Sequence, residues 1–184
     1  MCSASTSTGC GPPCSTTSRN SAISFFRPSH LVRRRRDGTF DVQLHEDARA
    51  VLVGLFREVA DAIEAAPDDD DLARLRPPAY SDDPDRDLEY QLLAGEELRT
   101  SHRASFATAI EAMGQARLSE DEMWAWLRAL NAIRLVVGTR LDIADDDATG
   151  PPAIEDLPPA TARLWTIYQY TTVIHYEVVR ALQG

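Results

Sequence analysis

Residues 119–138 read SEDEMWAWLRALNAIRLVVG, and this segment carries the clearest structural signal in the chain. Ser119 is followed three positions later by Glu122, the capping-box arrangement that satisfies the first free amides of a helix. Apolar side chains then recur every three or four residues, at Met123, Trp126, Leu127, Leu130, Ile133 and Val137. This period predicts an α-helix that starts at Ser119, buries one face and ends near Gly138.

Helical spacing of apolar residues continues on both sides of this segment. It predicts a helix over residues 45–66 and a second helical stretch from Leu88 to Met113 that stops at Gly114. Gly95 either bends that stretch or divides it into two helices. A final helix is expected from about Thr161 to residue 182.

Two shorter segments complete the expected fold. Residues 39–44 alternate apolar and polar side chains, which indicates a short strand or extended lead-in at an edge. Residues 72–80 read as a helical turn that the pair Pro77-Pro78 ends. We therefore expect an all-α fold, a small bundle of four to five helices with a short N-terminal extended segment or strand.

The chain of 184 residues has room for one domain and a tail. Residues 1–36 contain six arginines, no acidic residue and many serines, so we expect a disordered tail there and one helical domain over 37–184. A transit peptide or an over-extended gene start are alternative interpretations of the tail.

Charge and hydropathy exclude two classes of partner. Residues 37–184 hold 13 of the 19 arginines and all 29 acidic residues, a net charge of −16. A domain this acidic repels phosphates, so direct binding of nucleic acid is not expected. No apolar run approaches the roughly 18 residues of a membrane helix. We expect a soluble, cytoplasmic protein without a membrane partner.

All three cysteines lie in the tail, at Cys2, Cys10 and Cys14. The C-x3-C spacing of Cys10 and Cys14 allows a reversible disulfide, and the alternative is that these are incidental thiols. A zinc site is not expected because no fourth ligand follows at finger spacing and His30 is distant.

The predicted domain lacks the common catalytic signatures. G-x-S-x-G, H-E-x-x-H, P-loop and G-x-G-x-x-G motifs are absent from the sequence. His45, His102 and His175 fall on three different predicted helices. We therefore expect no enzyme, no metal and no cofactor. Five aromatic residues are candidates for either the core or interface anchors: Trp124, Trp126, Trp165, Tyr168 and Tyr170.

Asn131, Arg134, Asp82 and Asp83 form one candidate site. Asn131 and Arg134 are three residues apart on one helical face and point toward the core side, where they need partners. The acidic loop with Asp82 and Asp83 would supply them. A closed, buried ion pair would make the group structural. The alternative hypothesis is an enzyme that binds a small anionic or metal-bound ligand at these four residues.

Two motifs carry a family resemblance. LxxLRPPAYSDDP at residues 72–84 and, more specifically, WLRALNAIRLxxGTRL at 126–141 resemble an actinobacterial family now labelled the oxidative stress regulator AosR family. That family was long catalogued as a domain of unknown function, and its genes often neighbour the Clp adaptor ClpS. The likeness runs from about Arg36 to the C-terminus, so the three cysteines lie outside it.

The resemblance implies a regulator that responds to oxidation and acts through a sigma factor. It supplies no catalytic residues. Taken with the acidic surface, it leads us to expect a regulatory protein that takes part in the oxidative stress response and in transcription regulation by protein–protein interaction, without touching DNA.

Overall fold

The computed structural model describes residues 31–143 and 152–184. Four long helices dominate this part of the chain: α1 (Glu46–Ala65), α2 (Pro84–Ala112), α3 (Glu120–Arg140) and α4 (Pro159–Gln183). The remaining elements are two 3-10 turns and three short strands: η1 (Asp70–Leu75), η2 (Ile154–Asp156), β1 (Val32–Arg34), β2 (Phe40–Val42) and β3 (Arg117–Leu118). The expected all-α bundle with a short N-terminal strand is confirmed.

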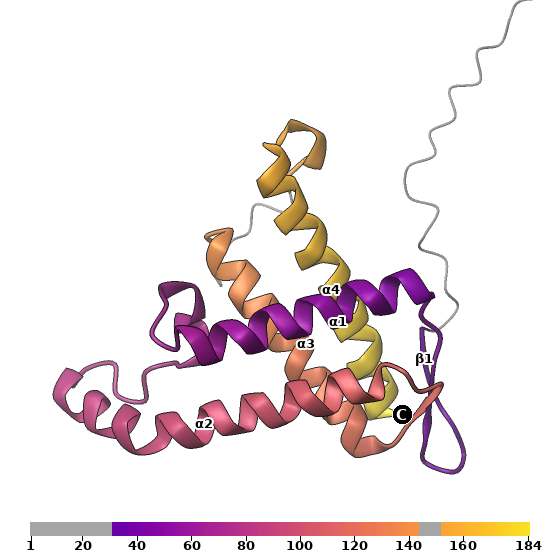
Figure 1. Cartoon of the computed structure of the whole chain (residues 1–184), viewed down its shortest axis with the longest axis horizontal. Helices are drawn as coiled ribbons and strands as arrows, with labels where there is room; N and C mark the ends of the chain where they lie inside the picture. The colour runs from indigo at the N-terminus through magenta and orange to yellow at the C-terminus, as the bar shows by residue number, and fades with distance from the viewer. Residues whose placement is uncertain (1–30, 144–151) are drawn as a thin grey trace, which may run out of the picture.

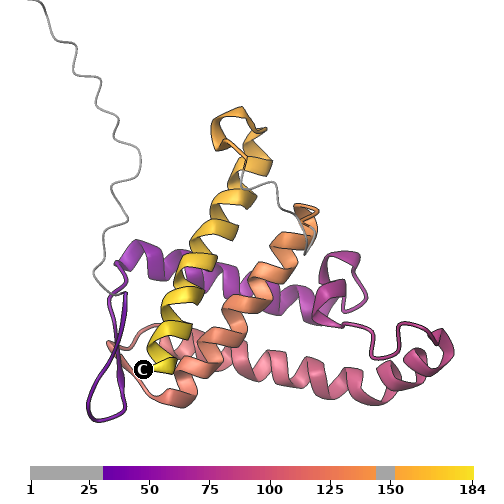
Figure 2. The same ribbon diagram turned by 180° about the vertical axis from the view of Figure 1, so that it is seen from behind.

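The long helices form two crossed layers. Figure 1 shows α1 and α2 running side by side in front of α3 and α4, and Figure 2 shows the same crossing from behind. The small sheet lies at the end where α2 and α4 finish. The opposite end of α2, which carries its N-terminus, extends past the crossing toward the η1 turn.

Helix α3 is the centre of the core, as its sequence predicts. It packs against α4, α2, η1 and α1. Its apolar stripe is buried, and Trp126, Leu130 and Ile133 are fully enclosed. The capping box is present, because the backbone amide of Ser119 donates to Glu122 Oε2 at 2.7 Å and the Glu122 amide donates to Ser119 Oγ at 3.3 Å.

The sheet corrects two expectations about the N-terminal region. Its order is β1-β2-β3 with antiparallel pairing, so β2 is the central strand and not an edge segment. Ordered structure begins before residue 37, because Leu31 and Val32 are buried. A bond from Arg180 to the Val32 carbonyl, at 3.4 Å, joins β1 to α4. The rest of the expected tail, residues 1–30, lies outside the described residues.

Helix α2 is one continuous helix of 29 residues. It begins at Pro84, earlier than Leu88, and passes through Gly95 without a break. Asp83 caps it by accepting a hydrogen bond from the Arg86 amide at 3.1 Å. Proline at the first helical position suits this start, because its fixed φ fits a helix and its missing N–H is not needed there.

Candidate functional site

Asn131 and Arg134 lie on α3 where it faces α4. Arg134 Nε donates to Thr172 Oγ1 at 3.0 Å, and a terminal nitrogen of the same guanidinium donates to Asn131 Oδ1 at 3.3 Å. The guanidinium carbon lies 5.8 Å from the centre of the Tyr168 ring. The Arg134 side chain is half-buried. The contacts with Thr172 and Tyr168 join α3 to α4 through a neutral acceptor and an aromatic face, whereas the bond to Asn131 lies within α3.

His175 lies close enough to this group for its titration to be affected. Burial lowers the pKa of the His175 imidazole, and the positive charge of Arg134 lowers it further. The histidine therefore favours its neutral form beside the guanidinium.

Asp82 and Asp83 belong to a different part of the molecule. Asp83 caps the N-terminus of α2, and Asp82 is exposed beside it. Within the described residues, no ion pair joins Arg134 to either carboxylate. The expected pairing of Asn131 and Arg134 with this loop is therefore not made. The four residues form two separate groups, so no observation favours a ligand site built from all of them.

The structure also bears on the cysteines, the metal-ligand types and the tryptophans that the sequence singles out. Cys10 and Cys14 lie outside the described residues. In the described part of the chain, no three His, Cys, Asp or Glu side chains group closely enough to hold a metal ion. No helix there is long and apolar enough to cross a bilayer. Of the tryptophans, Trp126 belongs to the core, whereas Trp124 is 42% exposed.

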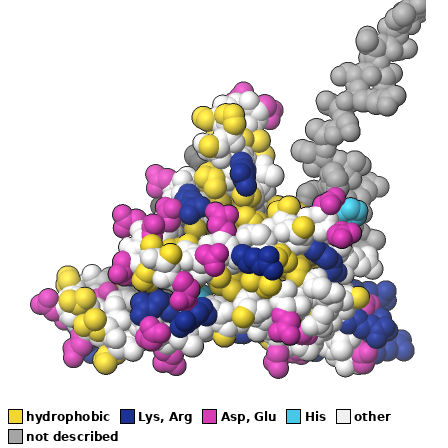
Figure 3. Space-filling view, in the orientation of Figure 1, with side chains coloured by type: hydrophobic (Ala, Val, Ile, Leu, Met, Phe, Trp, Pro, Cys, Tyr) yellow, Lys and Arg dark blue, Asp and Glu magenta, His cyan; other side chains and the backbone are white. Residues whose placement is uncertain are grey.

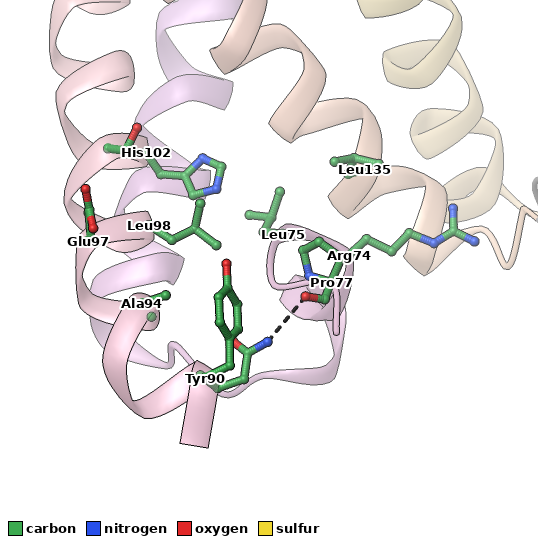
Figure 4. Close-up of a pocket in the computed structure, with 12 residues that line it drawn as sticks. Arg74, Leu75, Pro77, Tyr90, Ala94, Glu97, Leu98, His102 and Leu135 are labelled. Carbon is green, nitrogen blue, oxygen red and sulfur yellow. Dashed lines mark hydrogen bonds between the residues drawn. The ribbon is translucent and has the colours of Figure 1, made fainter. Parts of the chain in front are cut away.

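A groove opens between α2, η1 and α3. Its volume is about 570 Å³, and its walls are mainly apolar. Figure 4 shows the Tyr90 ring and the His102 imidazole of α2 directed into it, opposite Leu75 and Pro77. Gln91 Nε2 donates to the Pro77 carbonyl at 3.3 Å and so ties the two walls together.

Three residues on the groove wall differ in what they contribute to it. Gly95 lies on its wall, and a β-carbon added there would meet no atom within 4 Å. Arg74 reaches away from the groove, and its terminal nitrogen donates to the Ile143 carbonyl at 2.5 Å. Burial lowers the pKa of His102, and a hydrogen bond with the Leu75 backbone opposes part of this effect. The groove thus presents a neutral imidazole and a phenol in an apolar setting.

The N-terminal half of α2 also exposes three leucines of its apolar pattern. Leu88, Leu92 and Leu93 are 61%, 76% and 78% exposed. Figure 3 shows hydrophobic side chains gathered at this end of the helix with acidic side chains around them. We call Leu88, Leu92 and Leu93 the leucine face. Sequence reasoning missed it because helical spacing marks an apolar side without showing what covers it.

Acidic side chains surround the leucine face. Residues 82–97 contain seven acidic residues and one arginine, Arg86. Of these acids, Glu96 pairs with Arg99 at 2.6 Å. No described basic side chain pairs with Asp85, Glu89 or Glu97. The face therefore combines exposed apolar area with carboxylates that are free to attract a cation.

Comparison with known proteins places the chain in a family without assigning an activity. No curated protein and no solved structure matches the chain. The model of one family, described as a domain of unknown function (DUF2017), matches residues 27–182. This match runs from before β1 to residue 182, one residue before the end of α4. The protein therefore belongs to the DUF2017 family.

Proposed function

We propose that this protein is a regulatory protein that acts by binding another protein. The supporting observation is the leucine face, three large apolar side chains more than half exposed within six residues of one helix. Covering exposed apolar area favours association, and an exposed apolar patch rimmed by polar residues marks a protein interaction site. In the part of the chain that the structure describes, no three His, Cys, Asp or Glu side chains group closely enough to hold a metal ion.

The partner is proposed from the sequence resemblance. Likeness to the oxidative stress regulator family supports a sigma factor as the partner and a role in transcription within the cytoplasm. The acidic balance of residues 37–184 supports contact with a protein and not with DNA.

A pull-down tests the proposal. The full chain, immobilised through its C-terminus, is incubated with reduced and with peroxide-treated lysate of the source organism, and bound proteins are identified by mass spectrometry against empty beads. We expect a sigma factor or another transcription factor to be enriched. Recovery of no transcription factor under either condition would contradict the proposal.

Redox control is proposed for Cys10 and Cys14. Peroxide oxidises the two thiols to one disulfide, the two hydrogens leave in water, and the closed C-x3-C loop alters partner binding. Mass spectrometry after alkylation should show loss of two hydrogen atoms from the peptide that spans residues 10–14 after peroxide treatment. A Cys10→Ser variant should show no such loss. Two alkylated thiols after peroxide, or a native N-terminus near Arg36, would overturn this part.

A further inference from the structure

We infer that the leucine face of α2 receives a basic amphipathic helix of the partner protein. This inference rests on the proposed protein-binding function and names the surface and the chemistry of its partner. The apolar component comes from Leu88, Leu92 and Leu93, which lie on the half of α2 that extends past the crossed layers.

The spacing of acids and leucines along α2 matches a helix. Leu88 and Leu92 are four residues apart and share one face, and Asp85 precedes Leu88 by three positions on the same stripe. Glu89 lies four positions before Leu93, and Glu97 lies four positions after it. Carboxylates thus flank the leucines at both ends of the face. An apolar stripe bordered by Lys or Arg at the same three and four residue spacing is the complementary surface.

Charge makes a second copy a poor occupant. The segment from residue 82 to 97 has a net charge of −6, so two copies meeting through this face would bring like charges together. Like charges brought together across an interface oppose association. A basic partner gains from the same carboxylates.

The chain's own tail is a poor occupant. Its large apolar side chains near the domain are Ile23, Phe25 and Phe26, and Ile23, the farthest of them from Leu31, is eight residues away, about 27 Å when extended. The Leu31 carbonyl accepts a hydrogen bond from Gln43 beside the sheet, and the neighbouring Val42 bonds to Ala116 just after the C-terminal end of α2. The helix from Leu88 to Ala112 is itself about 36 Å long at 1.5 Å per residue. Even fully extended, this apolar segment therefore falls short of Leu88.

Peptide binding tests the inference directly. The probe is a fluorescein-labelled peptide of 18 residues or so, built from Leu, Lys and Ala to place leucines on one helical face and lysines beside them, titrated with the full chain and followed by anisotropy. The comparison peptide carries Glu at every Lys position. We expect the Lys peptide to bind at least tenfold more tightly than the Glu peptide, and its affinity to fall as salt rises.

Variants then locate the site. The triple change Leu88→Gln, Leu92→Gln and Leu93→Gln should weaken binding of the Lys peptide at least tenfold, and Glu89→Lys should weaken it severalfold. Glutamine keeps good helix propensity, so α2 should stay folded, and circular dichroism checks this. The matched control is Val51→Gln, at an apolar side chain 53% exposed on α1, which should bind as the wild type does. Equal binding by wild type and triple variant, or equal binding of both peptides, overturns the inference.

Failure of this surface can be told apart from failure of the proposed function. In the pull-down described above, cross-linked and repeated with the triple variant, a partner retained equally by both proteins leaves the proposed function standing and refutes the surface. A partner that depends on the leucines and is cross-linked to α2 through a basic helical segment supports it. A partner cross-linked there through an acidic segment, or through a second copy of this chain, refutes it. Enrichment of no transcription factor from wild-type protein refutes the proposed function.

Discussion

Gly95 is a glycine in the interior of a helix that no close contact requires. It lies inside α2 and on the wall of the groove, and its place for a β-carbon is open space. Glycine inside a helix is about 1 kcal/mol less favourable than alanine. Since a β-carbon would fit beside Gly95 without a clash, steric need does not explain the glycine. The effect of adding that carbon on stability can be measured.

Gly95→Ala should raise the free energy of unfolding by about 0.5–1 kcal/mol, measured by urea denaturation. Gly38→Ala is the contrasting variant, because Gly38 has φ of +85° in the turn between β1 and β2. An alanine is strained in that conformation, so this variant should lower the free energy of unfolding by about 1 kcal/mol. A change of stability in the same direction in both variants would contradict the different backbone requirements of Gly95 and Gly38.

His102, on the groove wall, makes the stability of the folded chain depend on pH. Burial lowers the pKa of its imidazole in the folded chain. The unfolded chain, with a pKa of about 6.5 at this residue, therefore takes up a proton at a pH where the folded chain does not. The stability that His102 contributes is present above that unfolded pKa and is lost as the pH falls below it.

The slope of unfolding free energy between pH 7 and pH 5 should be shallower in His102→Gln than in the wild type, measured by urea titration at several pH values. His45→Asn is the control, since the His45 side chain is 73% exposed and asparagine keeps a capping group at the start of α1. A slope unchanged in His102→Gln would contradict the assignment of a lowered pKa to this residue.

Among the elements, α3 combines a strong local start with the most central position in the core. Its capping box satisfies free amides at the first turn, and acids at Glu120, Asp121 and Glu122 suit the positive end of the helix dipole. Helix α2 differs because only its C-terminal half is enclosed, with Phe106 and Ala109 buried there. Both helices have apolar residues at helical spacing. These residues are buried along α3, which has neighbours along its length, but are exposed in the N-terminal half of α2, which extends past its neighbours.

Ser119→Ala should lower the free energy of unfolding by about 1 kcal/mol, because the Glu122 amide loses its acceptor at the start of α3. Equilibrium denaturation in urea measures the change. Ser81→Ala provides the comparison, since Ser81 is exposed in a loop and should shift stability by less than about 0.5 kcal/mol. Comparable losses in the two variants would argue against the capping role.

In the whole molecule, the small sheet, α1 and the end of α2 are joined by Arg49. Its guanidinium donates to the carbonyls of Val42 at 3.0 Å, Leu44 at 3.2 Å and Gln115 at 3.2 Å, and also to that of Met113. One side chain thus satisfies carbonyls from two segments that are distant in sequence, residues 42–44 and 113–115. The planar fork of arginine suits this task better than lysine does.

Arg49→Met should lower the free energy of unfolding by about 2–3 kcal/mol, because several partly buried carbonyls lose charged donors while the apolar stem is kept. Arg57→Met, at an exposed position of the same helix, should change stability by less than about 0.5 kcal/mol. Thermal and urea unfolding of both variants measure the difference. A loss no larger in Arg49→Met than in Arg57→Met would show that this arginine does not hold the segments together.

The sequence by itself determined the helices, because apolar spacing, the Ser119 cap and the proline and glycine boundaries act over a few residues. It did not determine that Phe40 belongs to a central strand, since that depends on Leu118 from a distant segment. Only the tertiary structure decided that Arg134 meets Thr172 and that the leucine face lies open. The physical reason is the same in each case. The local sequence pattern indicates which side of an element is apolar and which is polar. The packing of the whole chain decides which residues, if any, cover the apolar side.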